Sequence, residues 1–161
     1  MNIRLRKWTL EDAKFISKTL SDKKIANNLR DIPYPYTIEY AKEYIEYILS
    51  DENDEALAFI IELDGKTVGN ISVEKCDNDF VSVNLGYYID SLYWNKGIAT
   101  YAVKLMIDYL FSNTNIKRIY AEVFSDNISS SRVLEKNGFI FDCLLRNDVY
   151  KDTKLYYLRK D

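Results

Sequence analysis

The chain has 161 residues, the size of one ordinary domain, and 47% of them are hydrophobic with only five glycines and two prolines, which excludes disordered and collagen-like classes. It contains no histidine, so Ser-His-Asp and Cys-His nucleophile systems and the HExxH zinc site are excluded as well. A net charge of -3 argues against a nucleic-acid-binding protein, and no stretch has the apolar length of a membrane span.

The cysteines and the N-terminus bear on the cellular compartment. Cys76 and Cys143 lie far apart without CxxC spacing, which predicts two buried, reduced thiols and no metal site. The N-terminal segment reaches charged residues at Arg4 and Arg6 and lacks the apolar region of a signal peptide. We therefore expect an unprocessed, cytoplasmic, single-domain protein over residues 1–161.

The first third of the chain carries one strand signal and three helix signals. Ile3 and Leu5 alternate with polar positions, and Thr9 precedes two acids in the first turn of a helix. Two prolines interrupt the chain after a second helical stretch, and Thr37 then caps a longer helix. The predicted elements are a strand over 3–7 and helices over 13–20, 21–29 and 37–49.

The remainder alternates between strands and helices. Asp64-Gly65 is a strong hairpin signal between two apolar runs, and Gly138 ends the last helix. The predicted strands cover 56–63, 67–75, 80–89, 118–124, 139–145 and 150–159, and the helices cover 98–113 and 128–136. The order β-α-α-α-β-β-β-α-β-α-β-β predicts a mixed α/β sheet.

The chemically informative segment is Trp94-Asn95-Lys96-Gly97-Ile98-Ala99-Thr100, between a strand and a helix. A glycine turn at a helix start directs free backbone N–H groups and the positive end of the helix dipole at one point, which suits a phosphate or pyrophosphate. Lys96 adds positive charge. The spacing is neither a P-loop nor a GxGxxG motif, and most turns with this spacing alone bind nothing.

This turn resembles the pyrophosphate-binding turn of the GCN5-related N-acetyltransferase (GNAT) superfamily. Gly97 and Ala99 match its two small positions, Trp94 replaces its Gln or Arg, and Asn95 stands where glycine is frequent. Together with Gly86-Tyr87-Tyr88-Ile89-Asp90, the segment is similar to the RimJ/RimL-like ribosomal-protein-alanine acetyltransferase branch. A second match, the segment 127–139, resembles the family's Asn-x-x-Ser followed by a helix that closes on Gly-Phe.

The resemblance implies the GNAT acyl-CoA N-acyltransferase fold, a mostly antiparallel sheet splayed at the cofactor strand and flanked by helices, and it implies acetyl-CoA as the cofactor. The backbone of Tyr88, Ile89 and Asp90 is expected to pair with the pantetheine arm. Asn127 is expected to contact the cofactor, to cap the following helix, or both. The pyrophosphate is expected on the backbone amides of Asn95, Lys96, Gly97, Ile98, Ala99 and Thr100.

For catalysis, the resemblance places Leu134 where several relatives have a proton-donating tyrosine. Ser130 matches the serine that the RimL-like branch associates with the thioester sulfur, and the N–H of Ile89 is expected to polarise the carbonyl. Glu74 is the expected base through a water molecule, with Asp77 as the fallback. No metal is implied.

The acceptor site is expected opposite the cofactor, between residues 21–40 and the hairpin around 146–151. Tyr34 and Tyr36 are the candidate substrate-binding residues, whereas Tyr40 and Tyr44, on one helix face with Tyr47 and Ile48, are expected in the core. A protein N-terminal α-amine is the favoured acceptor because a larger fraction of it than of lysine is neutral near pH 7. The alternative acceptor is a small amine such as a polyamine or antibiotic, and the alternative function is a non-catalytic acyl-CoA-binding module. The protein is expected to be a monomer or a homodimer.

Overall fold

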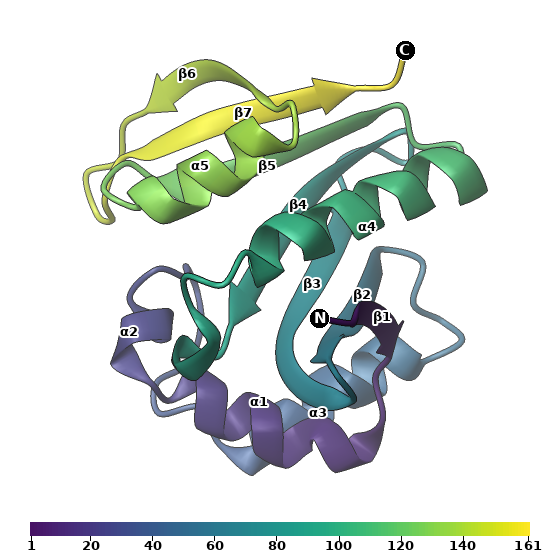
Figure 1. Cartoon of the computed structure of the whole chain (residues 1–161), viewed down its shortest axis with the longest axis vertical. Helices are drawn as coiled ribbons and strands as arrows, with labels where there is room; N and C mark the ends of the chain where they lie inside the picture. The colour runs from purple at the N-terminus through teal and green to yellow at the C-terminus, as the bar shows by residue number, and fades with distance from the viewer.

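The computed structural model describes residues 1–161 and contains one seven-stranded sheet in the order β1-β2-β3-β4-β5-β7-β6 (Figure 1). The strands are β1 (Ile3–Lys7), β2 (Ala56–Leu63), β3 (Lys66–Lys75), β4 (Ser82–Ile89), β5 (Arg118–Phe124), β6 (Ile140–Leu145) and β7 (Thr153–Arg159). The helices are α1 (Ala13–Leu20), α2 (Lys23–Ala26), α3 (Ile38–Leu49), α4 (Ile98–Asn113) and α5 (Ile128–Lys136), with 3-10 turns η1 (Leu10–Asp12) and η2 (Ser91–Tyr93). All strand pairs are antiparallel except β4 with β5. The predicted element order and the mixed, mostly antiparallel sheet are confirmed.

Two apolar cores cover opposite faces of the sheet. The larger core packs α4 and α5 against one face, where Met106 of α4 and Leu134 of α5 are fully buried. The smaller core packs α1 and α3 against the other face, through Ala58 and Ile60 of β2. Successive residues of β2 alternate between the two cores because side chains along a strand point to opposite faces. None of the helices combines the length and hydropathy that a bilayer crossing requires.

Several predicted details are wrong for local reasons. The second helix is a short turn, α2, instead of a helix over 21–29. The strand predicted from residue 80 begins at Ser82, because Phe80 has φ of 56° and lies in the preceding turn. The strand predicted over 139–145 begins at Ile140, and the one over 150–159 begins at Thr153. The two thiols expected to be buried are not: Cys76 is exposed and Cys143 is half-buried.

The prediction that the tyrosine face of α3 is buried is also partly wrong. Tyr44 packs edge-on against Trp8, with ring centroids 5.9 Å apart, as expected of a core residue. Tyr40 and Tyr47 are each 44% exposed, because Ala41 and Ile45 occupy the buried face of α3. The helix is therefore rotated relative to the predicted stripe.

A charged network fixes the N-terminal strand to the first helical turn. Arg6 donates to Asp12 at 2.8 Å and 2.9 Å and to Glu62 at 2.7 Å, and Arg4 donates to Glu62 at 2.6 Å. Burial opposes ionisation of Asp12, but the hydrogen bonds from Arg6 and Thr9 outweigh it and lower the pKa of that carboxyl. The hydrogen bonds from Arg4 and Arg6 likewise lower the pKa of Glu62.

We predict that Arg6→Met lowers the free energy of unfolding at neutral pH by about 2 kcal/mol, since Asp12 is left charged without its partner. Both carboxyls have lowered folded-state pKa values, so their stabilisation is present above about pH 4 and is lost as the pH falls further. Urea unfolding of both proteins between pH 7 and acidic pH measures this. The wild type should lose more stability on acidification than Arg6→Met; equal losses would contradict the network's role.

Candidate functional site

The site is created where β4 and β5 stop pairing. The two strands are parallel and pair from Ser82 with Arg118 to Leu85 with Ala121, and no pair follows although both strands continue. Beyond that point β4 stays on β3, while β5 stays on β7. In Figure 1 the two strands run side by side at first and separate toward their C-terminal ends. The sheet is therefore open between the unpaired halves of β4 and β5.

A cavity of about 520 Å³ occupies this opening. Its walls come from the divergent halves of both strands, the turn before α4, the first turn of α4, one side of α5 along its length, and the end of α2 with the residues that follow it. The lining residues include 85–89, 93–100, 121–123, Ile25, Asn28, Leu29, Asn127, Ser129, Ser130, Arg132, Val133 and Lys136. Most of the predicted cofactor residues therefore lie in one cavity; Asp90 does not line it.

The register of β4 on β3 decides which backbone groups face the cavity. Asp90 N–H donates to Val68 O at 2.8 Å, and at the other end Cys76 N–H donates to Ser82 O at 2.8 Å. Hydrogen-bonded positions alternate along an antiparallel pair, so the even-numbered residues of β4 bond to β3. The backbone groups of Tyr87 and Ile89 consequently point toward the opening. The backbone groups of Tyr88 and Asp90, which were expected to pair with the cofactor, are thus turned toward β3, and those of Tyr87 and Ile89 are turned away from it.

The turn before α4 holds a set of backbone donors without partners. Gly97 is the left-handed N-cap of α4, with φ of 76°, and Asn95 has φ of 63°, a conformation that asparagine adopts more readily than other non-glycine residues. The first N–H of this region with a protein acceptor is that of Tyr101, which donates to Gly97 O. The N–H groups of residues 95–100 are therefore free to bind an anion.

Trp94, which stands where the resemblance leads one to expect Gln or Arg, bonds to the end of β4. Its indole N–H donates to the carbonyl of Ile89 at 2.8 Å. This bond joins the end of β4 to the start of the turn and uses the Ile89 carbonyl, while the Ile89 N–H has no partner.

Three cationic side chains line the cavity. They are Lys96 on the turn and Arg132 and Lys136 on α5, and none of them forms an ion pair. The ammonium of Lys96 lies 5.5 Å from the ring centre of Tyr93. An acidic chain thus keeps unpaired positive charge here, which suits an anionic ligand. The sequence reasoning missed Arg132 and Lys136, although their spacing of four on a predicted helix puts them on one face.

The start of α5 contributes the two predicted polar residues. The side chain of Asn127 accepts from Ser130 N–H at 3.2 Å, so Asn127 is the N-cap of α5. Capping was one of the two roles expected of it. The Ser130 hydroxyl lies 2.6 Å from the Tyr87 hydroxyl, across the gap between α5 and β4. Burial raises the pKa of Tyr87 to about 12.

The carboxylates are arranged differently from the expectation. Glu74 is exposed near the end of β3, opposite Asn84, and does not line the cavity. Asp77 accepts from the N–H groups of Val81 and Ser82 at 2.9 Å and 3.0 Å; the first of these bonds contributes most to lowering its pKa. Glu122, one residue beyond the last β4–β5 pair, is the only carboxylate that lines the cavity.

The two segments expected to hold the acceptor do meet. The Tyr150 hydroxyl donates to Asp31 at 3.0 Å, and the Arg30 guanidinium lies over the rings of both Phe124 and Tyr150. Neither predicted substrate tyrosine lines the cavity. Tyr36 belongs to the smaller core with 7% exposure, whereas Tyr34 is exposed beside Lys23.

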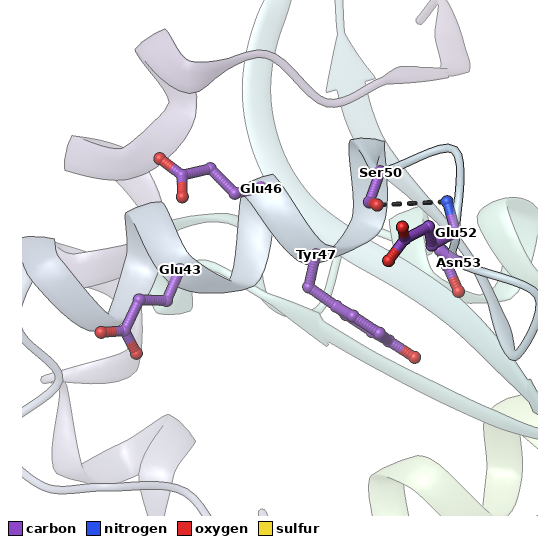
Figure 2. A pocket seen from close by; sticks show the side chains of 6 residues that line it. All are labelled: Glu43, Glu46, Tyr47, Ser50, Glu52 and Asn53. Carbon is purple, nitrogen blue, oxygen red and sulfur yellow. Dashed lines mark hydrogen bonds between the residues drawn. The ribbon is translucent and has the colours of Figure 1, made fainter.

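A second cavity, of about 470 Å³, lies at the end of α3 (Figure 2). It is lined by Glu43, Glu46, Tyr47, Ser50, Glu52 and Asn53. Figure 2 shows the side chains of Glu43 and Glu46 pointing to different sides of α3, while the Ser50 hydroxyl accepts the N–H of Glu52. The carboxylates do not converge on a common point, so the cavity between β4 and β5 is the candidate site.

Comparison with known proteins agrees with this geometry. A family model described as an acetyltransferase (GNAT) domain matches residues 2–140. An uncharacterized N-acetyltransferase p20 of Bacillus licheniformis is 30% identical over 146 residues, which cover 89% of this chain and 82% of that protein.

Solved structures of two acetyltransferases share the fold. The ribosomal-protein-S5-alanine acetyltransferase of Vibrio fischeri has a TM-score of 0.86 at 24% identity and covers 100% of this chain and 94% of its own. The spermidine N-acetyltransferase of Vibrio cholerae, in complex with CoA and spermine, has a TM-score of 0.84 at 21% identity, with coverages of 98% and 95%. The predicted family resemblance is confirmed: the chain belongs to the GNAT family of acetyl-CoA-dependent acetyltransferases.

Proposed function

We propose that this acetyltransferase transfers the acetyl group of acetyl-CoA to the α-amine of a protein N-terminus. The observation that carries the proposal is the single carboxylate, Glu122, at the point where the strands separate. Near pH 7 roughly one α-amine in ten is neutral, against roughly one lysine in a few thousand. One water-linked carboxylate can therefore supply the neutral nucleophile more easily for an α-amine.

The cavity fits acetyl-CoA, which supplies the thioester that is attacked. The free N–H groups of residues 95–100 suit its pyrophosphate, and Lys96, Arg132 and Lys136 add positive charge around the phosphates. The main-chain groups of Tyr87 and the N–H of Ile89 can pair with the pantetheine as an added strand would. Asn127 remains a proposed pantetheine or substrate contact through its side-chain NH₂, which donates to no protein acceptor.

The reacting groups then have separate tasks. The N–H of Ile89 stabilises the negative charge that develops on the carbonyl oxygen. Glu122 removes a proton from the amine through a water molecule, and Ser130 contacts the sulfur as the carbon–sulfur bond breaks. Glu74 stays the alternative base, since it lies on the same sheet face as Glu122 by strand alternation.

The charge of the cavity also bears on the acceptor. A polyamine carries several ammonium groups and binds best to several carboxylates, whereas this cavity has one carboxylate and three cations. The spermidine enzyme of Vibrio cholerae shares the fold, so a small amine is the second candidate. Tyr34 remains a proposed acceptor contact, since it is exposed on the segment that meets the last hairpin.

The acceptor prediction is tested by free-thiol release from acetyl-CoA. Peptides with a free α-amine should give the highest kcat/KM, above the same peptides with blocked N-termini and a free lysine, and above spermidine. Higher turnover with spermidine would overturn the peptide assignment. Binding of coenzyme A without turnover of any acceptor would overturn the proposed reaction.

The base is tested by comparing Glu122→Gln with Glu74→Gln, two isosteric changes on the strands that flank β4. Loss of a base that acts in the transition state should lower kcat by about 100-fold in Glu122→Gln, while Glu74→Gln should stay within about twofold. Steady-state kinetics with one peptide acceptor measures both. A larger loss in Glu74→Gln would return the role to Glu74.

The phosphate turn is tested by Gly97→Ala against Gly65→Ala. Both glycines have positive φ, 76° and 82°, and an added Cβ meets no protein atom within 4 Å at either position. The backbone strain is therefore matched, about 1 to 2 kcal/mol each. Only Gly97→Ala should weaken coenzyme A binding, about tenfold, because its methyl group occupies the space of the pyrophosphate. Calorimetric titration measures the affinity; equal affinities would place the pyrophosphate elsewhere.

A further inference from the structure

The contact between Tyr87 and Ser130 crosses the opening of the sheet. Tyr87 belongs to β4 and Ser130 to the first turn of α5, and their hydroxyl oxygens lie 2.6 Å apart. The Tyr87 hydroxyl also lies 3.3 Å from the Ser130 carbonyl oxygen. Both residues line the cavity, so the contact lies at the cavity wall.

The two contacts together fix the direction of both hydrogen bonds. A carbonyl oxygen can only accept, so the Tyr87 hydroxyl donates its one proton to the Ser130 carbonyl at 3.3 Å. The Ser130 hydroxyl then donates to the Tyr87 oxygen at 2.6 Å, and it has no other partner in the protein. One side chain of β4 therefore holds both the hydroxyl and the carbonyl of Ser130.

We propose that Tyr87 is a positioning residue, which holds Ser130 so that its hydroxyl can turn to donate to the sulfur of coenzyme A while its oxygen accepts from Tyr87. The proposal rests on the proposed function and adds a residue that acts through Ser130. The phenol of β4 thereby supports a serine of α5.

The path of each proton in the reaction indicates that Tyr87 positions Ser130 and does not itself donate a proton to the sulfur. As the new carbon–nitrogen bond forms and the carbon–sulfur bond breaks, the electron pair of the broken bond stays on sulfur. Ser130 stabilises that charge by a hydrogen bond and keeps its proton. The amine proton leaves through water to Glu122, and the sulfur takes a proton from solvent. Burial holds the pKa of Tyr87 at about 12, above the ~8.5 of a free cysteine thiol, so transfer from Tyr87 to the sulfur is unfavourable.

The first test is kinetic and uses a double-mutant cycle with a peptide acceptor. Tyr87→Phe should lower kcat about tenfold with little change in the KM for acetyl-CoA, because the aromatic ring is kept. Ser130→Ala should also lower kcat. The double variant should be no slower than Ser130→Ala, since the hydroxyl of Tyr87 acts only through Ser130. An unchanged kcat in Tyr87→Phe, or fully additive losses, would overturn the proposal.

The second test needs no acceptor and so separates this proposal from the proposed function. The ultraviolet absorbance of the thiolate reports the pKa of bound coenzyme A. Tyr87→Phe and Ser130→Ala should each raise that pKa by about one unit, because the hydrogen bond that stabilises the thiolate is lost or misdirected. The same thiol pKa in the variants and the wild type would overturn the proposal, whether or not the protein acetylates any acceptor tried.

Tyr156→Phe is the matched control. Tyr156 is also buried in the larger core, and its hydroxyl donates to Glu135 of the same helix α5 at 3.1 Å, outside the cavity. The substitution removes a tyrosine hydrogen bond that ties α5 to β7, and it leaves the contacts of Ser130 unchanged. The thiol pKa and kcat should be unchanged in this variant; a shift equal to that of Tyr87→Phe would show that the effect is anchoring of the helix and would overturn the specific role.

Discussion

The end of pairing between β4 and β5 is the constraint on which the site depends. Up to Leu85 and Ala121 the two strands satisfy each other's backbone groups; beyond them, Tyr87 and Ile89 expose a free edge inside the protein. An unpaired strand edge binds a chain that offers complementary donors and acceptors. The same divergence gives Glu122 access to the cavity and separates Tyr87 from β5, so that its side chain can meet Ser130 on α5.

The two cores make this opening possible. α4 and α5 cover one face with a fully buried apolar layer, and α1 and α3 cover the other through β2. Because β4 remains bonded to β3 along its length, its free edge stays rigid while β5 turns away with β7. The indole bond from Trp94 to Ile89 then fixes the turn that presents the free N–H groups of residues 95–100. The protein thus provides donors and cations for the cofactor without histidine or metal ligands.

The sequence predicted the elements and the cofactor turn because their signals are local. The helix over 98–113 has an apolar period and a glycine start, and Asn127 and Gly138 bracket the next helix. The exact donors of β4 were missed, because whether Tyr87 or Tyr88 faces the opening depends on the register with β3. Glu122 was missed for a similar reason: its access depends on where pairing stops, which is a property of the whole sheet. Glu74 was favoured because its strand is adjacent in sequence to the cofactor strand.

Amide hydrogen exchange of β4, with and without coenzyme A, tests the central claim most directly. The amides of Tyr88 and Asp90 bond to β3 and should be protected in both states. Those of Tyr87 and Ile89 should exchange readily in the free protein and become protected when coenzyme A binds, together with the amides of residues 95–100. Protection of Tyr87 and Ile89 before binding, or no change in either on binding, would contradict the account.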